Sequence, residues 1–133
     1  MRVLIVEDEV GCRLLLKRFL LNVARADAVA DGQEAVEAFR LALSGGEPYD
    51  VVLMDIEMPG MDGQEALKAM REMESRLTEG KKRETGIYFI TAHSDQRNVC
   101  DAIFKGGATG YLVKPVEKEV LLDAIGLSDR PSS

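Results

Sequence analysis

Apolar segments of two kinds alternate along the chain. Short segments rich in branched residues occupy positions 3–6, 26–30, 51–54, 87–91 and 110–113 and predict five β-strands. Longer segments follow them in which apolar residues recur every three or four positions, and this spacing predicts five helices. Strands that alternate with helices form a parallel sheet covered on both faces, so the pattern predicts a single-domain α/β fold.

The composition of the strand segments predicts their places in the sheet. Residues 3–6, 51–54 and 87–90 are apolar throughout, as expected for strands that are buried on both faces. Residues 26–30 mix apolar and polar side chains and predict an edge strand.

In the first helical segment, the apolar spacing runs through Leu14, Leu15 and Phe19, and Leu16 and Leu20 continue the apolar face.

Polar residues predict where the helices begin. Asp31 precedes the second helix as an N-cap, and Asp62 is a plausible N-cap of the third, with Glu65 three residues later as its capping partner. Ser94 or Asp95 can cap the fourth helix. The last helix is predicted to be short, because Gly126 and the polar end of the chain cannot extend it.

The length of 133 residues fits one domain, which we expect to cover residues 1–127, with residues 128–133 as a flexible tail. With 17 basic and 23 acidic residues the net charge is −6, so direct binding of nucleic acid is not expected. The apolar segments are too short to span a membrane, and the first residues do not resemble a signal peptide. Two cysteines without metal-ligand spacing predict reduced thiols and a cytoplasmic location.

Polar residues suited to phosphoryl chemistry follow four of the five predicted strands. Glu7 and Asp8 come after the first strand, Asp55 after the third, and Lys114 after the fifth, while Thr91 ends the fourth. Because ligands of open parallel sheets bind beyond the carboxyl ends of the strands, we expect these five side chains to converge.

Such a convergence has a physical interpretation. Three neighbouring carboxylates repel one another and need a counter-charge. Mg²⁺ prefers oxygen ligands, and Mn²⁺ is an alternative ion for the same ligands. A carboxylate oxygen can attack phosphorus, and a lysine and a threonine suit the charge of a transferring phosphoryl group. The pattern therefore predicts a magnesium-dependent aspartate that accepts a phosphoryl group.

The chain resembles the receiver domain of two-component response regulators, in the single-domain form typical of chemotaxis regulators. The resemblance covers residues 2 to about 126. It rests on Val-Leu-Ile-Val-Glu7-Asp8-Glu9, Val-Val-Leu-Met-Asp55-Ile-Glu-Met-Pro-Gly-Met-Asp-Gly63, Ile90-Thr91-Ala92, Gly107-Ala108, Tyr111 and Lys114-Pro115. It implies a flavodoxin-like, doubly wound (βα)₅ fold with the strand order 2-1-3-4-5.

The resemblance also implies roles at the predicted site. Asp55 would be the phosphoacceptor, and Asp8 would bind the metal together with Asp55. Glu7, as the first member of the acidic pair, would bind the metal through a water molecule. The backbone carbonyl of Glu57 would complete the metal site, and Lys114 would pair with the phosphoryl oxygens.

Further residues are implied in switching and in setting rates. Thr91 would move toward the phosphoryl group, and Tyr111 would rotate inward, which changes the face formed by the fourth helix, fifth strand and fifth helix. Glu57 and His93 stand two residues after Asp55 and Thr91, where side chains could tune dephosphorylation. Gly63 would allow close approach of the third helix. Pro115 would follow Lys114 through a cis peptide bond.

The implied function is a phosphorylation-activated signalling switch that catalyses its own phosphorylation and slow dephosphorylation and is not a conventional enzyme. A sensor histidine kinase or a histidine phosphotransfer protein would supply the phosphoryl group, and a downstream protein would read the switch. The chain could be a complete protein or a fragment of a longer one.

Three alternatives stay open from the sequence. A magnesium-dependent phosphohydrolase of the haloacid dehalogenase type would need a second aspartate where Glu57 stands. A flavin-binding module would need a phosphate-binding loop where Glu7 and Asp8 stand. A degenerate receiver would keep the fold and act only by docking.

Overall fold

Five parallel strands form one sheet at the centre of the structure, a computed structural model that describes residues 1–56, 61, 63–77, 84–92 and 106–127. The strands are β1 (Arg2–Val6), β2 (Arg25–Val29), β3 (Val51–Asp55), β4 (Gly86–Thr91) and β5 (Gly110–Val113). Their order across the sheet is β2-β1-β3-β4-β5, which confirms the predicted topology. The order reverses between β1 and β3, so the carboxyl ends of these two strands border the crevice where ligands of such sheets bind.

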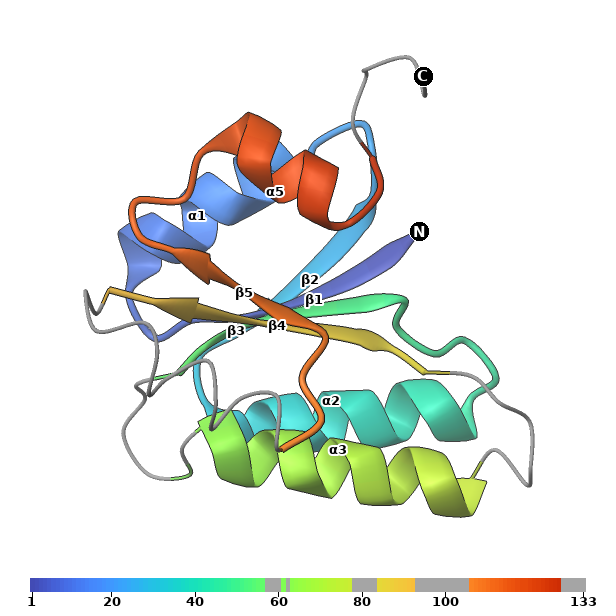
Figure 1. Cartoon of the computed structure of the whole chain (residues 1–133). Helices are drawn as coiled ribbons and strands as arrows, with labels where there is room; N and C mark the ends of the chain where they lie inside the picture. The colour runs from blue at the N-terminus through green and yellow to red at the C-terminus, as the bar shows by residue number, and fades with distance from the viewer. Residues whose placement is uncertain (57–60, 62, 78–83, 93–105, 128–133) are drawn as a thin grey trace.

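Helices cover both faces of the sheet (Figure 1). One face carries α1 (Val10–Phe19) and α5 (Lys118–Ala124), and the other carries α2 (Gly32–Ser44) and α3 (Gly63–Leu77). No helix in the described part of the chain is long and apolar enough to cross a membrane. The predicted fourth helix, with its candidate caps Ser94 and Asp95, falls outside the described residues, as do Asp62 and the predicted tail at 128–133.

Two apolar clusters, one on each face, hold the layers together. Phe39 of α2, Met70 of α3 and Phe89 of β4 are fully buried on one face, and Leu16 of α1 and Leu121 of α5 are buried on the other. The strands contribute alternate residues to the two clusters because successive side chains of a strand point to opposite faces. The β2 strand is only half-buried, as predicted for an edge.

The sequence pattern misjudges the buried face of α1. Leu16 and Leu20 are buried against the sheet, but Leu14 is 61% exposed and Leu15 is 43% exposed. Nearly every position of this helix that is not charged is apolar, so periodicity does not separate its core side from its outer side. The outer side of α1 is therefore an exposed apolar surface.

Local features at the start of two helices agree with the predictions. The Asp31 side chain accepts a hydrogen bond from the backbone N–H of Glu34 at 2.8 Å, which makes it the N-cap of α2. A Cβ atom added at Gly63 would lie 2.5 Å from the Phe89 ring and 3.2 Å from the carbonyl oxygen of Asp55. Glycine is therefore needed there to let α3 begin directly against the end of β3.

A buried ionic network that the sequence did not predict ties α3 to the connections that precede β4 and β5. Glu74 is 5% exposed and accepts hydrogen bonds from Arg71 at 2.7 Å and from the backbone N–H of Thr85 at 2.7 Å. Arg71 also donates to the carbonyl oxygens of Thr85 at 2.9 Å and Gly107 at 3.0 Å. This network fixes where β4 and β5 start, and therefore where their carboxyl ends lie.

Replacing Glu74 by alanine should lower the free energy of unfolding by about 2–4 kcal/mol, because it removes the carboxylate that pairs with Arg71 and leaves the buried N–H of Thr85 without its acceptor. Urea denaturation followed by circular dichroism measures the change. Glu72→Ala, on the exposed side of the same helix, is the matched control and should cost no more than about 0.5 kcal/mol. Equal losses in the two variants would show that the network contributes nothing specific.

Candidate functional site

Glu7, Asp55 and Lys114 meet at the carboxyl edge of the sheet. Successive side chains of a strand point to opposite faces, and these three residues stand at or just after the ends of their strands, at positions that point to the same face. Hydrogen bonds from Glu7 N to Val29 O at 3.1 Å and from Lys114 N to Thr91 O at 2.8 Å continue the strand pairing past β1 and β5. Glu7, Asp55 and Lys114 each stand two positions after a core residue of the face covered by α1 and α5. Those core residues are Ile5, Leu53 and Leu112.

Lys114 is the cation at the centre of this group. Its Nζ donates a hydrogen bond to Asp55 Oδ2 at 2.9 Å and lies 3.4 Å from Glu7 Oε2. Both carboxylates are buried, with exposures of 6% for Asp55 and 1% for Glu7. Pro115 follows Lys114 through a cis peptide bond, as the resemblance implies.

Glu7 holds a buried charge that the protein only partly compensates. Its Oε1 accepts a hydrogen bond from the backbone N–H of Glu9 at 3.2 Å, whereas its buried Oε2 accepts none from the described residues. Burial, followed by the nearby charge of Asp55, raises the pKa of Glu7 above its usual value. Additional positive charge beside Glu7 would therefore be favourable.

Lys114 has the opposite balance. Burial alone would lower its pKa, but the hydrogen bond to Asp55 and the charges of Asp55 and Glu7 outweigh burial. The pKa of Lys114 consequently lies above its usual value. Lys114 stays charged through the whole physiological pH range.

The acidic group fits a hard divalent cation. Glu7, Asp8 and Asp55 each offer a carboxylate oxygen, and these oxygens all lie within 4.8 Å of one another. The ligand atoms are all oxygens, Asp8 is exposed, and Glu7 Oε2 is a buried acceptor without a hydrogen-bond donor among the described residues. An oxygen-only set that is open on one side suits Mg²⁺, which retains several of its water ligands.

Thr91 and Tyr111 occupy the other phase of the alternation. Thr91 ends β4 and is 1% exposed. Tyr111 is half-buried against the cluster on the α2 and α3 face, and it pairs in register with Phe89, two residues before Thr91. Thr91 and Tyr111 are therefore diagonal neighbours on one face of the sheet. Glu57 and His93 fall outside the described residues, so their predicted roles stay predictions.

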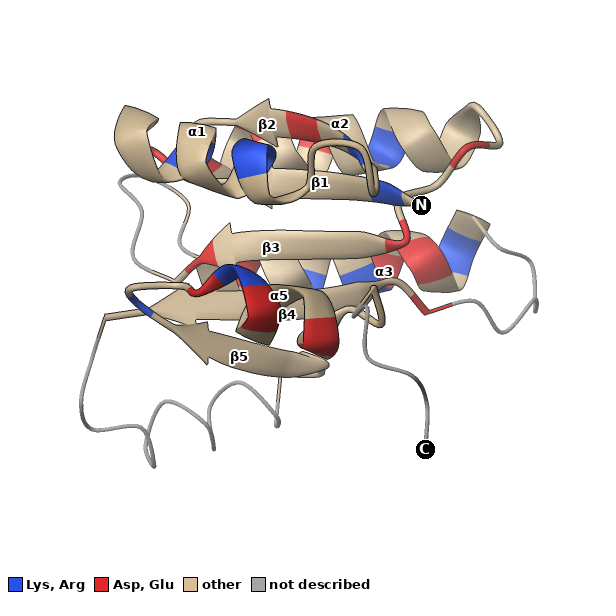
Figure 2. Ribbon diagram, turned by 90° about the horizontal axis from the view of Figure 1, so that it is seen from above, with Lys and Arg blue, Asp and Glu red and all other residues tan. Residues whose placement is uncertain are grey.

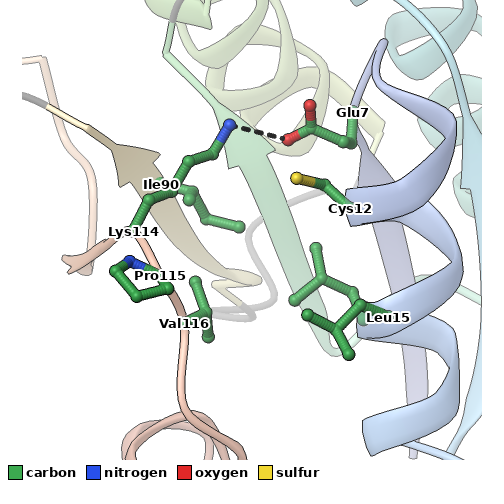
Figure 3. A pocket seen from close by; sticks show the side chains of 8 residues that line it. Glu7, Cys12, Leu15, Ile90, Lys114, Pro115 and Val116 are labelled. Carbon is green, nitrogen blue, oxygen red and sulfur yellow. Dashed lines mark ion pairs between the residues drawn. The ribbon is translucent and has the colours of Figure 1, made fainter.

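A cavity of about 310 Å³ adjoins the charged group, and the sequence did not indicate it (Figure 3). It lies between α1 and the connection from β5 to α5, and Glu7 and Lys114 mark one end of it. Cys12 of α1 also lines the cavity, and its thiol donates a hydrogen bond to Glu9 at 2.6 Å. That bond, together with burial, raises the pKa of Cys12 to about 11, so the thiol is protonated at neutral pH.

Comparison with known proteins places this arrangement in one family. The family model of the response regulator receiver domain matches residues 3–126. The chain is 33% identical over 129 residues to the chemotaxis protein CheY of Bacillus subtilis, and the aligned region covers 93% of each protein. It is also 35% identical over 135 residues to probable histidine kinase 2 of Oryza sativa subsp. indica, and there it spans 94% of this chain but only 12% of the kinase.

Solved structures of the same type superpose closely. The chemotaxis protein CheY4 of Vibrio cholerae gives a TM-score of 0.77 at 30% identity and covers 94% of this chain and 95% of that one. A complex of the Saccharomyces cerevisiae phosphotransfer protein Ypd1 with the receiver domain of Ssk1 gives a TM-score of 0.78 at 30% identity. The match covers 94% of this chain and 86% of that one. The receiver domain of the Arabidopsis thaliana histidine kinase CKI1 in complex with Mg²⁺ gives a TM-score of 0.79 at 25% identity. The match covers 92% of this chain and 88% of that one.

The sheet order and the acidic group facing a lysine define a class of doubly wound domains with a charged site at the carboxyl edge of the sheet. The family match makes the class specific. The chain belongs to the response regulator receiver domain family of two-component signalling.

Replacing Lys114 by methionine should lower the free energy of unfolding by about 1–3 kcal/mol at about pH 8, because it leaves Glu7 and Asp55 without their counter-charge. The folded-state pKa of Lys114 is raised, so its contribution is fully present at neutral pH and is lost only under strongly alkaline conditions. The loss caused by the substitution should shrink toward about pH 4, because the raised pKa of Glu7 lets this carboxylate take up a proton as the pH falls.

Urea denaturation of both proteins in metal-free buffer at the two pH values tests this. Lys118→Met, an exposed lysine of α5, is the control and should change stability little at either pH. A loss for Lys114→Met that is the same at both pH values would contradict an electrostatic role for Lys114.

Proposed function

We propose that this receiver domain accepts a phosphoryl group on Asp55 from a phosphohistidine and acts as a phosphorylation-dependent switch. The observation that carries the proposal is the group formed by Asp55, Lys114 and Glu7. A buried carboxylate is held 2.9 Å from an ammonium group, beside a second buried carboxylate of which one oxygen, Glu7 Oε2, accepts no hydrogen bond from the described residues. Such a group can attack phosphorus and then bind the added charge.

Each side chain has a defined part in the transfer. An oxygen of Asp55 forms the new O–P bond while the P–N bond to the donor histidine breaks, and the electron pair remains on the imidazole nitrogen, which takes up a proton. Lys114 donates a hydrogen bond to Asp55 beforehand and pairs with a phosphoryl oxygen afterwards. When bound by Asp8, Asp55, Glu7 through water and the carbonyl of Glu57, Mg²⁺ supplies charge that offsets the phosphoryl oxygens.

The switch depends on the opposite face of the sheet. The buried hydroxyl of Thr91 ends β4, and Tyr111 lies diagonally beside it on β5. Movement of Thr91 toward a phosphoryl group on Asp55 vacates space into which the half-buried Tyr111 can turn. The surface around β5 and α5 then changes shape and binds a downstream protein, with a shift limited by that protein's preference for one form.

The phosphodonor is a histidine kinase or a histidine phosphotransfer protein. The complex of Ypd1 with the Ssk1 receiver domain supports this class of partner. The outer side of α1 exposes Val10 and Leu14 and carries Lys17 and Arg18 in its last turn, and Figure 2 shows basic residues along this helix. Slow hydrolysis of the phosphoaspartate resets the switch. The cytoplasmic location predicted from the sequence stays a prediction.

A docking-only receiver is the second candidate, and the chemistry of the site favours the phosphorylated switch over it. A domain that only docks has no use for two buried carboxylates held against one lysine, since this arrangement costs stability. A phosphohydrolase of the haloacid dehalogenase type would need an aspartate at position 57, where this chain has Glu57.

Incubation with acetyl phosphate and Mg²⁺ should add one phosphoryl group to the protein, and Asp55→Asn should abolish the addition because an amide cannot form the acyl phosphate. Intact-mass spectrometry measures the adduct. Asp123→Asn, an exposed aspartate on α5, is the control and should label like the wild type. Undiminished, acid-labile labelling of Asp55→Asn would move the acceptor to another residue.

Millimolar Mg²⁺ should raise the melting temperature of the wild type, because the ion relieves the repulsion among Glu7, Asp8 and Asp55. Asp8→Ala should weaken Mg²⁺ binding about tenfold or more, measured by a thermal-shift titration. Glu119→Ala, at an exposed acid of α5, is the matched control and should bind Mg²⁺ normally. An unchanged titration in Asp8→Ala would remove Asp8 from the ligand set.

A further inference from the structure

The cavity between α1 and the connection from β5 to α5 has two chemically different ends (Figure 3). We call it the α1–β5 cavity, and its apolar wall comes from Leu15 and Leu16 of α1, Ile90 of β4, and Pro115 and Val116 after β5. At the other end Glu7, Cys12 and Lys114 converge, with the lysine reaching toward the glutamate. A ligand that fits this cavity must combine an apolar body with one polar group.

The polar end selects a hydrogen-bond donor that carries positive charge. Glu7 Oε2 is buried and accepts no hydrogen bond from the described residues, although it lies 3.4 Å from the Lys114 ammonium. Glu7, Asp8 and Asp55 carry three negative charges within a few ångströms, and Lys114 supplies one positive charge against them. A cation that donates a hydrogen bond satisfies the unused acceptor and reduces this excess, whereas an anion would add to it.

The volume limits the size of the ligand. A cavity of roughly 150 Å³ is enough to hold benzene in a protein interior. A cavity of about 310 Å³ therefore accommodates one ring, or a branched chain of similar size, together with a short arm that carries the polar group.

We propose that the α1–β5 cavity binds a small apolar primary amine, with its body between α1 and the β5–α5 connection and its ammonium group hydrogen-bonded to Glu7 Oε2. The amine occupies a site that is separate from the phosphoacceptor oxygen but shares Glu7 with the proposed metal site. Amine and Mg²⁺ therefore weaken each other's binding, and by reciprocity the factor is the same in both directions. The domain would in this way respond to amines by a lower affinity for Mg²⁺.

Nuclear magnetic resonance of methyl-labelled protein tests the site directly, with phenethylamine as the probe in metal-free buffer near neutral pH. Saturable shifts are expected at the methyl groups of Ile90 and Val116, which line the cavity. The uncharged isostere 2-phenylethanol should bind about tenfold more weakly, because it loses the charge-assisted hydrogen bond. Phenylacetate should not bind. Equal binding of all three compounds would overturn the role of Glu7.

Two tryptophan variants on one helix provide a matched test of location. Leu15 lines the cavity and is 43% exposed, so Leu15→Trp can fill the space without burying a new core residue. Leu14 is 61% exposed and does not line the cavity, which makes Leu14→Trp its control. Leu15→Trp should weaken phenethylamine at least tenfold, and Leu14→Trp should leave the affinity unchanged. Equal affinities in both variants would place the amine elsewhere.

The charge requirement and the coupling to metal have their own readouts. Glu7→Gln should remove the preference for phenethylamine over 2-phenylethanol, and saturating Mg²⁺ should weaken phenethylamine several-fold in the wild type. Unchanged affinity for phenethylamine in saturating Mg²⁺ would contradict a shared Glu7.

If phenethylamine shifts no methyl group of the cavity while Leu15→Trp slows phosphotransfer from a histidine phosphotransfer protein, the cavity receives a partner side chain and the proposal fails. Labelling of Asp55 by acetyl phosphate is unaffected by that failure.

Discussion

Two buried carboxylates held against one lysine are the constraint on which the structure depends. Glu7 and Asp55 lose most of their contact with water, and the ammonium group of Lys114, which contacts both, offsets their mutual repulsion. The sheet provides this geometry because all three residues follow strands in the same phase of the side-chain alternation. A slip of one residue in the register of β1, β3 or β5 would turn one of the charges to the opposite face. The apolar clusters and the network around Glu74 therefore serve the site as well as the fold, because they fix the register.

Much of this arrangement follows from the sequence. The strands buried on both faces, the edge strand and the Asp31 cap are visible in local patterns of apolar and capping residues, and the polar residues at the ends of four strands indicated the charged group. The strand order came from the family resemblance, since periodicity alone does not order strands. The buried face of α1 was not predictable, because Leu14, Leu15 and Leu16 are identical in chemistry and only packing distinguishes them. Glu74 was missed for a related reason, since a glutamate on a helix is ordinarily solvated and its burial depends on Arg71 and on the distant Thr85. The cavity beside Cys12 arises from four separate segments and has no signal in any one of them.

The proposed phosphoryl acceptance, the proposed switch and the proposed amine site all depend on the same excess of negative charge. The group around Asp55 has more negative charge than Lys114 offsets, so it favours any cation that can reach it. A divalent ion would reach the group from the exposed side of Asp8, and the α1–β5 cavity would give a second route, from the apolar side, to Glu7. The helix α1 contributes to the cavity and to a candidate docking surface. Its inner edge lines the α1–β5 cavity, and its outer side is an apolar and basic surface suited to a partner protein. Occupation of the α1–β5 cavity can thus affect the proposed metal site through the buried carboxylate of Glu7.

A crystal structure of the protein with Mn²⁺ and beryllofluoride would test the central claim most directly, since Mn²⁺ scatters anomalously and beryllofluoride mimics a phosphoryl group on a carboxylate. We expect one anomalous peak bonded to Asp8 and Asp55, with the beryllium on Asp55 and a fluoride within hydrogen-bond distance of Lys114 Nζ. A peak elsewhere, or beryllofluoride on a different carboxylate, would contradict the assignment of this edge of the sheet as the phosphoryl-accepting site.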